Sequence, residues 1–462
     1  MRTPELWTLP LQIATPAFVG GSTPDEVAEV RVPSIRGALR TWYRLLVGPD
    51  VASGLPGAEA AALRESMLFG GAGGTWGQSV AVLSLAELAP QGYAKARLEG
   101  DGVKYLGFSL TMGQNDRCYV APGTRFTLRA VFPQGVSDTQ AELLLASLWC
   151  WVALGGLGSR SRRGFGSLEW AGKAACTDLH GRPVERGWPG WSEPPADMRG
   201  HAQWLKKGLA EVRQRVEQAL EPLKRQATTA KEPLPRVLAS LEKARATRDV
   251  DGAPHVVAGG DEGPAETARA IRDVDSGPAY HLGLVPKEAA SAGSSRVVLW
   301  SGQGAGFASA LDAANAIGMR LMEFRRERGI DRLLRGALST LEAGGLPERA
   351  PARAAFGLPL GLQNVKKRGT RFELRPLHRV VAEGKPTQRV EGSRAASPLL
   401  IRIAPVGKHF TVVLTLLDGP WPGRDYDVRE ARAPHAFMPG DPGNDLPLRF
   451  LNDIPGGQEV WP

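Results

Sequence analysis

The sequence predicts an α+β protein made of two halves of comparable size. The chain has 462 residues, which is more than one hydrophobic core usually organises. Strand and helix patterns interleave along it, but neighbouring strands are not regularly separated by helices as in a doubly wound sheet. Between about residues 176 and 276 the chain becomes irregular and then charged, which indicates a boundary between the halves.

Alternating apolar residues predict strands in the first half. The opening strand is expected within 8–20, where Gly20 ends the run, and a short strand is expected over 29–32. An amphipathic helix follows over 35–47, with Ser34 as its N-cap. Further strands are expected over 79–85, 104–112, 125–132 and 167–170, and an apolar helix over 139–154.

The middle of the chain predicts helices and a linker, and the second half then repeats the α+β character of the first. A charged helix is expected over about 199–226, a second helical piece over 234–248, and a flexible Asp/Gly/Pro-rich linker over 249–265. The second half is expected to hold strands over 296–300, 356–362 and 370–374, a helix over about 307–327, and a hairpin over 398–417. The similar make-up of the halves suggests a duplicated fold.

The charge balance favours a polyanionic partner, although only mildly. Lys and Arg number 57 against 48 Asp and Glu, which gives a formal net charge of +9. No run approaches the roughly 20 apolar residues that span a bilayer, and the N-terminus has no signal-peptide layout. The three cysteines form no metal-spaced pair. We therefore expect a cytoplasmic protein with no membrane partner and no metal or organic cofactor.

A row of arginines lies on the predicted helix over 35–47. Arg36, Arg40 and Arg44 stand at i, i+4 and i+8, so their side chains share one face, which we call the arginine row. The apolar stripe of the same helix is expected to face the core, and it consists of Ile35, Leu39, Trp42 and Leu46. No acidic residue occurs within 30–49, so the arginines are expected to lack a local partner. Such a row suits a phosphate backbone, and the alternative is an ordinary solvated helix face.

Residues 155–167 form a glycine–arginine loop between two predicted elements. Glycines such as Gly156, Gly158 and Gly164 let backbone N–H groups approach an anion closely. Arg160, Arg162 and Arg163 add positive charge to the same loop. The Gly-Lys-Ser/Thr of a P-loop is absent. The loop is therefore predicted to bind an anion, and the alternative is a flexible hairpin connection.

The glycine spacing, with further motifs along the chain, carries a resemblance to a known family. Gly156-Leu-Gly158, five residues and then Gly164-Phe-Gly166 resembles the glycine-rich loop of the RAMP superfamily of CRISPR RNA-binding proteins. Other segments resemble, within it, the first subunits of type III-B (Cmr) effector complexes. These segments are 13–21, 33–44, 65–70, 105–108, 318–325, 355–359 and 394–400.

The resemblance implies a fold and a role. It implies two ferredoxin-like, RRM-related RAMP domains, here over 1–175 and 277–462, with a partly helical insertion over 176–276. It also implies a non-catalytic RNA-binding subunit that lies near the 3′ part of the CRISPR guide RNA and helps to engage target RNA in antiviral defence. Its partners would be the guide RNA, the target RNA and other RAMP subunits of the Cmr complex.

Two rival readings and one further basic segment stay open. The first 179 residues contain no histidine, which argues against histidine-based cleavage there. Asp25 lies in a loop that resembles the one carrying the aspartate of target-cutting RAMP subunits. The alternative function is therefore a metal-assisted endoribonuclease that uses Asp25. The structural alternative is that Asp25 is an ordinary polar turn residue. A scaffold without RNA contact is the third reading. Lys366, Lys367 and Arg368 are expected on a loop that reaches RNA or a neighbouring subunit, or is merely solvated.

Overall fold

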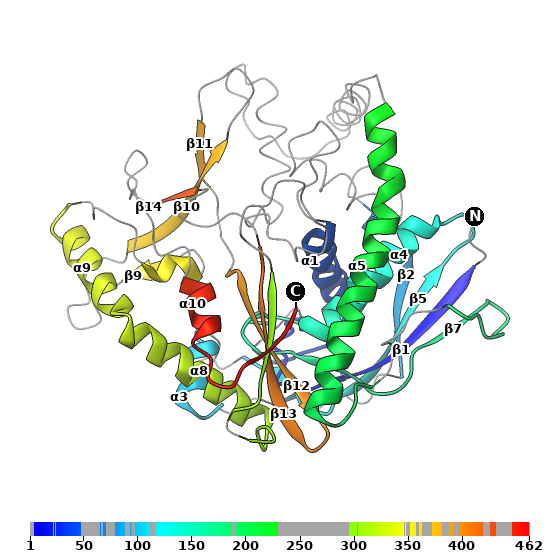
Figure 1. The fold of residues 1–462 in the computed structure, drawn as a ribbon, viewed down its shortest axis with the longest axis horizontal. Coiled ribbons are helices and arrows are strands. Elements are labelled where there is room, and N and C mark those ends of the chain that lie inside the picture. The colour runs from blue at the N-terminus through cyan, green and yellow to red at the C-terminus, as the bar shows by residue number, and fades with distance from the viewer. Residues whose placement is uncertain are drawn as a thin grey trace.

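Figure 1 shows the computed structural model, which holds two main sheets with helices around them. The structure describes residues 4–21, 23, 25–47, 65, 68–70, 79–87, 93–94, 98–108, 110, 117–186, 191, 193–229, 295–302, 304–345, 347, 352–356, 360–362, 372–380, 388–391, 397–418, 426–430 and 446–461. The mixture of helices with antiparallel sheets confirms the predicted α+β class.

The first sheet has the strand order β2-β5-β1-β6, and all its pairs are antiparallel. Its strands are β1 (Glu5–Ile13), β2 (Val82–Ala86), β5 (Arg125–Phe132) and β6 (Leu168–Trp170), and β7 (Ala175–Thr177) also pairs with β1. In β1 every second residue is buried, as the sequence alternation predicts for a half-covered sheet. The predicted opening strand was placed too late, because β1 already pairs with β5 from Glu5 and ends at Ile13.

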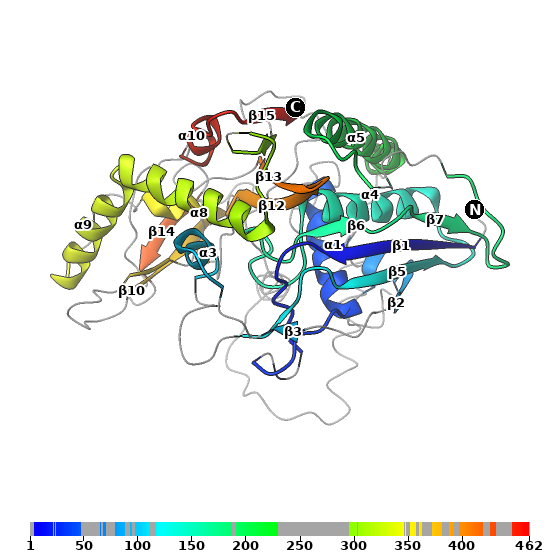
Figure 2. The ribbon, with the colours of Figure 1, turned by 90° about the horizontal axis from the view of Figure 1, so that it is seen from below.

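Helices α1 (Val32–Val47) and α4 (Asp138–Leu154) accompany this sheet, and α4 lies beside β1 and β6 in Figure 2. Helix α1 begins before the predicted N-cap, because Pro33 suits the first turn of a helix. The strand expected over 29–32 is therefore wrong. Helix α4 begins with a capping box in which the Ser137 hydroxyl accepts from the Gln140 amide. Every residue from 143 to 154 is buried, so α4 is covered all round.

The start of the segment predicted as a strand over 104–112 lies instead in a short helix, α3 (Asp101–Leu106). Its conformation is fixed by a distant contact, since the Gly102 amide donates to the Asn315 side chain at 2.9 Å. Tertiary contact of this kind overrides local strand propensity. The first half also contains a small two-stranded sheet of β3 (Tyr93–Ala94) and β4 (Tyr119–Val120).

The second main sheet has the strand order β12-β13-β8-β15, again antiparallel throughout. It consists of β8 (Arg296–Trp300), β12 (Leu399–Val406), β13 (His409–Leu416) and β15 (Gln458–Trp461), with helices α8 (Ala310–Glu327) and α10 (Leu446–Asn452). When the four main strands of each sheet are counted in chain order, both sheets read 2-3-1-4. The two halves therefore share one strand order, as the suspected duplication requires.

Further elements extend the second half. They are α9 (Ile330–Glu342), a 3-10 helix (Ala352–Phe356), and a separate sheet of β9 (Leu360–Leu362), β10 (Phe372–Val380), β11 (Gln388–Glu391) and β14 (Tyr426–Glu430). The strand expected over 356–362 is partly wrong, because Phe356 ends the 3-10 helix, whereas 360–362 pairs with β10 as expected for a strand.

The middle of the chain contributes α5 (Met198–Thr229), which confirms the predicted charged helix. It packs on α4 and on β15, and Figure 1 shows it running alongside α4. The approach is close, because a Cβ at Gly208 would lie 2.0 Å from the Trp149 ring. The predicted second helical piece over 234–248 and the linker over 249–265 lie outside the described residues.

The two halves interlock through their cores. Strand β8 shows this, because Val297 and Leu299 point into the cluster formed with α4, whereas Val298 and Trp300 point into the cluster formed with α8. The second cluster in turn contains Val103 and Phe165 from the first half. Each hydrophobic cluster therefore includes residues of both halves.

Within the described residues, no helix is both long and apolar enough to cross a bilayer.

Candidate nucleic-acid interface

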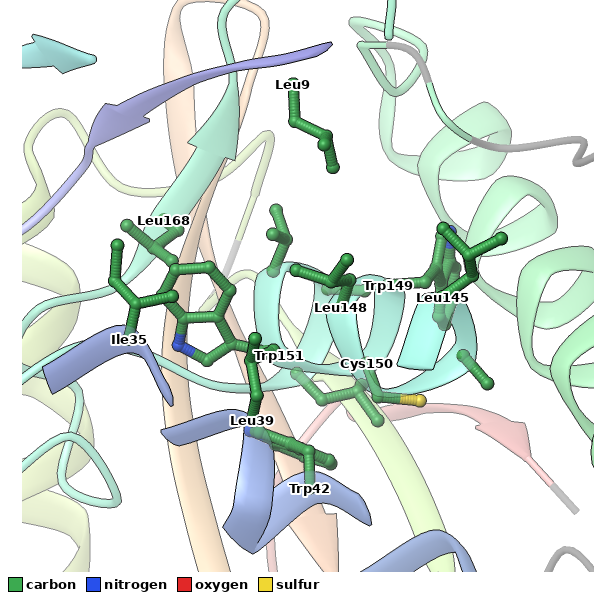
Figure 3. Packing of buried hydrophobic residues seen from close by; sticks show 14 of the residues in the cluster. Leu9, Ile35, Leu39, Trp42, Leu145, Leu148, Trp149, Cys150, Trp151 and Leu168 are labelled. Atoms are coloured by element: carbon green, nitrogen blue, oxygen red, sulfur yellow. The ribbon is translucent and has the colours of Figure 1, made fainter. Parts of the chain in front are cut away.

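The arginine row is positioned by the packing of α1. Ile35, Leu39 and Trp42 are buried and lie close to α4, as Figure 3 shows. The predicted apolar stripe is confirmed. Its packing leaves the arginines on another side of the helix, where each is partly exposed.

The sequence offers the arginine row no acidic partner within 30–49, but two of its members pair with a carboxylate further along the chain. Glu65 is buried and forms an ion pair with Arg44, whose Nη2 donates to Oε1 at 3.0 Å. The Arg40 Nε lies 3.6 Å from the same carboxylate, and its Nη2 donates to the Gly70 carbonyl at 2.7 Å. Within the described residues Arg36 has no ion pair, unlike the other two arginines of the row.

The glycine–arginine loop is an ordered turn whose glycines serve close backbone contacts. Gly158 has φ +90°, and a Cβ there would lie 2.5 Å from the Phe18 carbonyl oxygen. Gly166 has φ +63°, and its amide donates to the Pro16 carbonyl at 2.9 Å. At Gly156 a Cβ would come within 2.8 Å of the Gly166 oxygen. The reading of this loop as a flexible connection is therefore wrong.

The arginines of this loop reach towards other segments. The exposed Arg160 donates to the Phe108 carbonyl at 2.7 Å. Arg162 contacts the Ser397 carbonyl at 3.4 Å, and Arg163 donates to the Phe356 carbonyl at 3.0 Å, both in the second half. Burial lowers the pKa of the Arg163 guanidinium. Two of the three predicted arginines therefore also join the halves.

The loop is tied to the second sheet at strand β12. The Ile401 amide donates to the Arg162 carbonyl at 3.0 Å, and Arg163 forms an isolated parallel bridge with Ile401. Arg402 is buried and donates to the Leu168 carbonyl at 2.6 Å. Burial lowers the pKa of Arg402 to about 10, against the pull of the Glu169 carboxylate. Strand β12 is an edge of its sheet, and the loop covers that edge.

The remaining predicted site residues do not join these arginines. Asp25 is exposed, and the Arg117 Nε lies 4.0 Å from its carboxylate. Among the described residues, no three His, Cys, Asp or Glu side chains gather as a metal site would require. Lys366, Lys367 and Arg368 lie outside the described residues.

Sequence reasoning overlooked several charged and aromatic residues next to the loop. Tyr105 and Arg325 contact each other across the two halves, with the Arg325 Nη1 donating to the Tyr105 hydroxyl at 2.8 Å. Both residues, and Glu65 as well, lie in segments that carry the family resemblance. The resemblance therefore marked these residues but did not indicate what they do. Arg353, on the 3-10 helix, had no signal in the sequence.

Comparison with known proteins bears on this arrangement. Residues 11–169 match the RAMP superfamily. The CRISPR system Cmr subunit Cmr1-1 of Pyrococcus furiosus is 35% identical over 150 residues, which cover 31% of this chain and 41% of the relative. The match thus spans less than half the length of that relative. The predicted resemblance to the RAMP superfamily and to the first subunit of Cmr complexes is confirmed.

Two solved structures align over nearly the whole chain. The crystal structure of apo Cmr1 from Pyrococcus furiosus is 17% identical with a TM-score of 0.48, and the alignment covers 99% of this chain and 98% of that one. The cryo-EM structure of the type III-B Cmr-beta bound to cognate target RNA contains a chain that is 12% identical with a TM-score of 0.42, over 96% of this chain and 99% of that one.

Proposed function

We propose that this chain is a non-catalytic RNA-binding subunit of a type III-B CRISPR (Cmr) effector complex. In that role it would hold the 3′ region of the guide RNA and help to capture target RNA in antiviral defence. The observation that carries the proposal is the RAMP match over residues 11–169 together with the 35% identity to a Cmr1 subunit.

We further infer that the chain holds two ferredoxin-like RAMP domains, over 1–175 and 277–462, around an insertion over 176–276. The shared strand order 2-3-1-4 supports this, because it is the order that a βαββαβ chain produces in a ferredoxin-like sheet. Helix α5 supports the helical character of the insertion.

RNA contact would be dominated by phosphates. Guanidinium groups bind phosphate oxygens bidentately, and the net charge of +9 favours such a partner. Within the predicted set, Arg36 and Arg160 are the best placed, since Arg36 has no ion pair among the described residues and Arg160 is exposed. Arg40 and Arg44 are partly neutralised by Glu65, so we assign them a smaller share.

No observation favours the metal-assisted nuclease that Asp25 would serve. The carboxylate is exposed and lies near an arginine, whereas a Mg²⁺ site needs converging oxygen ligands. The proposed subunit therefore acts by binding, in the cytoplasm and beside other RAMP subunits.

The test is purification of the tagged full-length chain from cells that encode it, followed by sequencing of bound RNA and identification of bound proteins. We expect RNAs that carry CRISPR repeat sequence, together with several RAMP subunits. Recovery of the chain alone, or of unrelated partners, from cells that transcribe a CRISPR array would refute the proposal.

A further inference from the structure

Four segments that are far apart in the sequence meet at the joint between the halves. The end of α3 supplies Tyr105, the loop supplies Arg160 and Arg163, α8 supplies Arg325, and the 3-10 helix supplies Arg353; we call these five residues the junction cluster. Figure 1 shows α3 against α8, and this contact brings Tyr105 and Arg325 together.

Side-chain contacts link these segments directly. The Arg325 guanidinium carbon lies 5.2 Å from the centre of the Tyr105 ring, and its Nη1 donates to the Tyr105 hydroxyl. Arg160 donates to the carbonyl of Phe108, at the end of the same α3 segment. Arg163 donates to the carbonyl of Phe356, which ends the 3-10 helix of Arg353.

The junction cluster holds more positive than negative charge. It contains four guanidinium groups, and the carboxylate of Asp331 forms an ion pair with one of them, that of Arg325. Asp331 and Tyr105 outweigh burial and raise the pKa of Arg325. The other two partly buried arginines are only partly compensated: burial lowers the pKa of Arg163 and of Arg353, neighbouring arginine charges lower both further, and Tyr105, with Asp331 in the case of Arg353, offsets only part of this.

Such an arrangement is unfavourable for the empty protein and favourable for an anion. Like charges that are partly removed from water repel each other strongly, because the surrounding dielectric is lower. A phosphate placed among them would relieve this repulsion and accept several charge-assisted hydrogen bonds. The guanidinium fork fits phosphate oxygens, and arginine keeps its charge even after burial.

We propose that the junction cluster binds a backbone phosphate of single-stranded RNA, with Arg163 and Arg353 as its main donors and the exposed Arg160 on the solvent side. The choice of RNA rests on the proposed function, whereas the anion site itself rests on the arginines. The site would let one RNA strand contact both halves of the chain at once.

The test compares Arg353→Met with Arg182→Met in the full-length chain. Methionine removes the charge of Arg353 and keeps an unbranched apolar side chain. Arg182 offers the matched control, because it is an exposed arginine in the turn after β7, and Figure 1 shows β7 and α9 at opposite ends of the molecule. Binding of a labelled oligouridine is measured by anisotropy over a series of salt concentrations.

For Arg353→Met we expect a loss of RNA affinity of roughly tenfold, as for one lost charge-assisted contact. The slope of log affinity against log salt should become shallower by about 0.7. The thermal midpoint of the free protein should stay unchanged or rise, because a repelled charge has been removed. A purely structural Arg353 would instead give a lower midpoint. Arg353→Lys should retain most of the salt slope, and Arg182→Met should behave as the wild type.

Each other outcome overturns a distinct statement. If the wild type and Arg182→Met bind RNA and Arg353→Met binds equally well with the same slope, the junction cluster is not the site, while the proposed function stands. If the wild type binds no RNA even within its complex, the proposed function itself fails. In a third experiment, inorganic phosphate is added at fixed ionic strength and the thermal midpoint is measured. If phosphate raises the midpoint of the wild type but not of Arg353→Met, and Arg353→Met still binds RNA as the wild type does, the site binds a free anion rather than RNA.

Discussion

Replacement of Gly318 by alanine adds one methyl group where the backbones of the two halves lie close together. Gly318 lies on α8 and faces Gly102 of α3. A Cβ at Gly318 would lie 2.3 Å from the Gly102 oxygen and 2.6 Å from its Cα. Ordinary contact begins near 3.4 Å, so the two helices must separate by roughly 1 Å. The obstructing atoms are backbone, and therefore no side-chain rotation can make room.

Two opposing effects set the magnitude. Alanine in place of glycine inside a helix stabilises the folded state by about 1 kcal/mol. Overpacking costs about 1–3 kcal/mol, and here the upper end applies because backbone meets backbone. Separation of the helices also weakens the bond from the Gly102 amide to Asn315, at a cost of about 1 kcal/mol. We expect a net loss of about 2–3 kcal/mol in the free energy of unfolding.

Urea unfolding followed by tryptophan fluorescence measures this loss as a shift of the midpoint. The matched control is Gly336→Ala in α9, where nothing lies within 4 Å of the added Cβ. The control should gain about 0.5–1 kcal/mol, since only helix propensity acts. A midpoint for Gly318→Ala at or above that of the wild type would refute the inferred contact between the helices.

Three further predictions follow from single residues. Glu65→Gln should lower the free energy of unfolding by roughly 2 kcal/mol, because it removes a buried carboxylate from partners that are only about one-third exposed; an unchanged urea midpoint would contradict the ion pairs. RNA incubated with Mg²⁺ should stay intact with the wild type and with Asp25→Ala alike. If the wild type cleaves the RNA on a gel and Asp25→Ala does not, the protein is a nuclease that uses Asp25. His201 is buried, and desolvation lowers its pKa to about 3. Below pH 6.5 this histidine is therefore protonated in the unfolded chain but stays neutral in the folded chain. Stability should therefore fall by on the order of 2 kcal/mol between about pH 6.5 and pH 5, and thermal melts of His201→Phe should show a correspondingly flatter decline over that range.

Elements with local signals were predictable from the sequence. Strands β5 and β8 match their predicted bounds, because alternating or continuous apolar residues mark them directly. The hairpin of β12 and β13 is likewise confirmed, with Gly407 in its turn at φ +61°. Helix α3 could not be predicted in this way, because its partner Asn315 lies more than two hundred residues further along the chain.

The same distinction applies to the candidate site. The apolar stripe of α1 was predictable from helical spacing, and it fixed the side on which the arginine row lies. The acidic partner of that row was not predictable from the sequence, because Glu65 is 21 residues beyond Arg44 and contacts it only in the folded chain. No local pattern around Arg353 indicates which charges it meets, because Arg325 and Asp331 lie more than 20 residues away and Tyr105 and Arg163 belong to the first half.

The covered edge of β12 has a consequence for how the chain is made. An uncovered edge strand exposes N–H and C=O groups that pair readily with another chain. The first half, with its loop, emerges from the ribosome before β12 does, so the cover exists by the time the edge is synthesised. We therefore expect residues 295–462 to aggregate when expressed alone, and co-expression with the first half to rescue them.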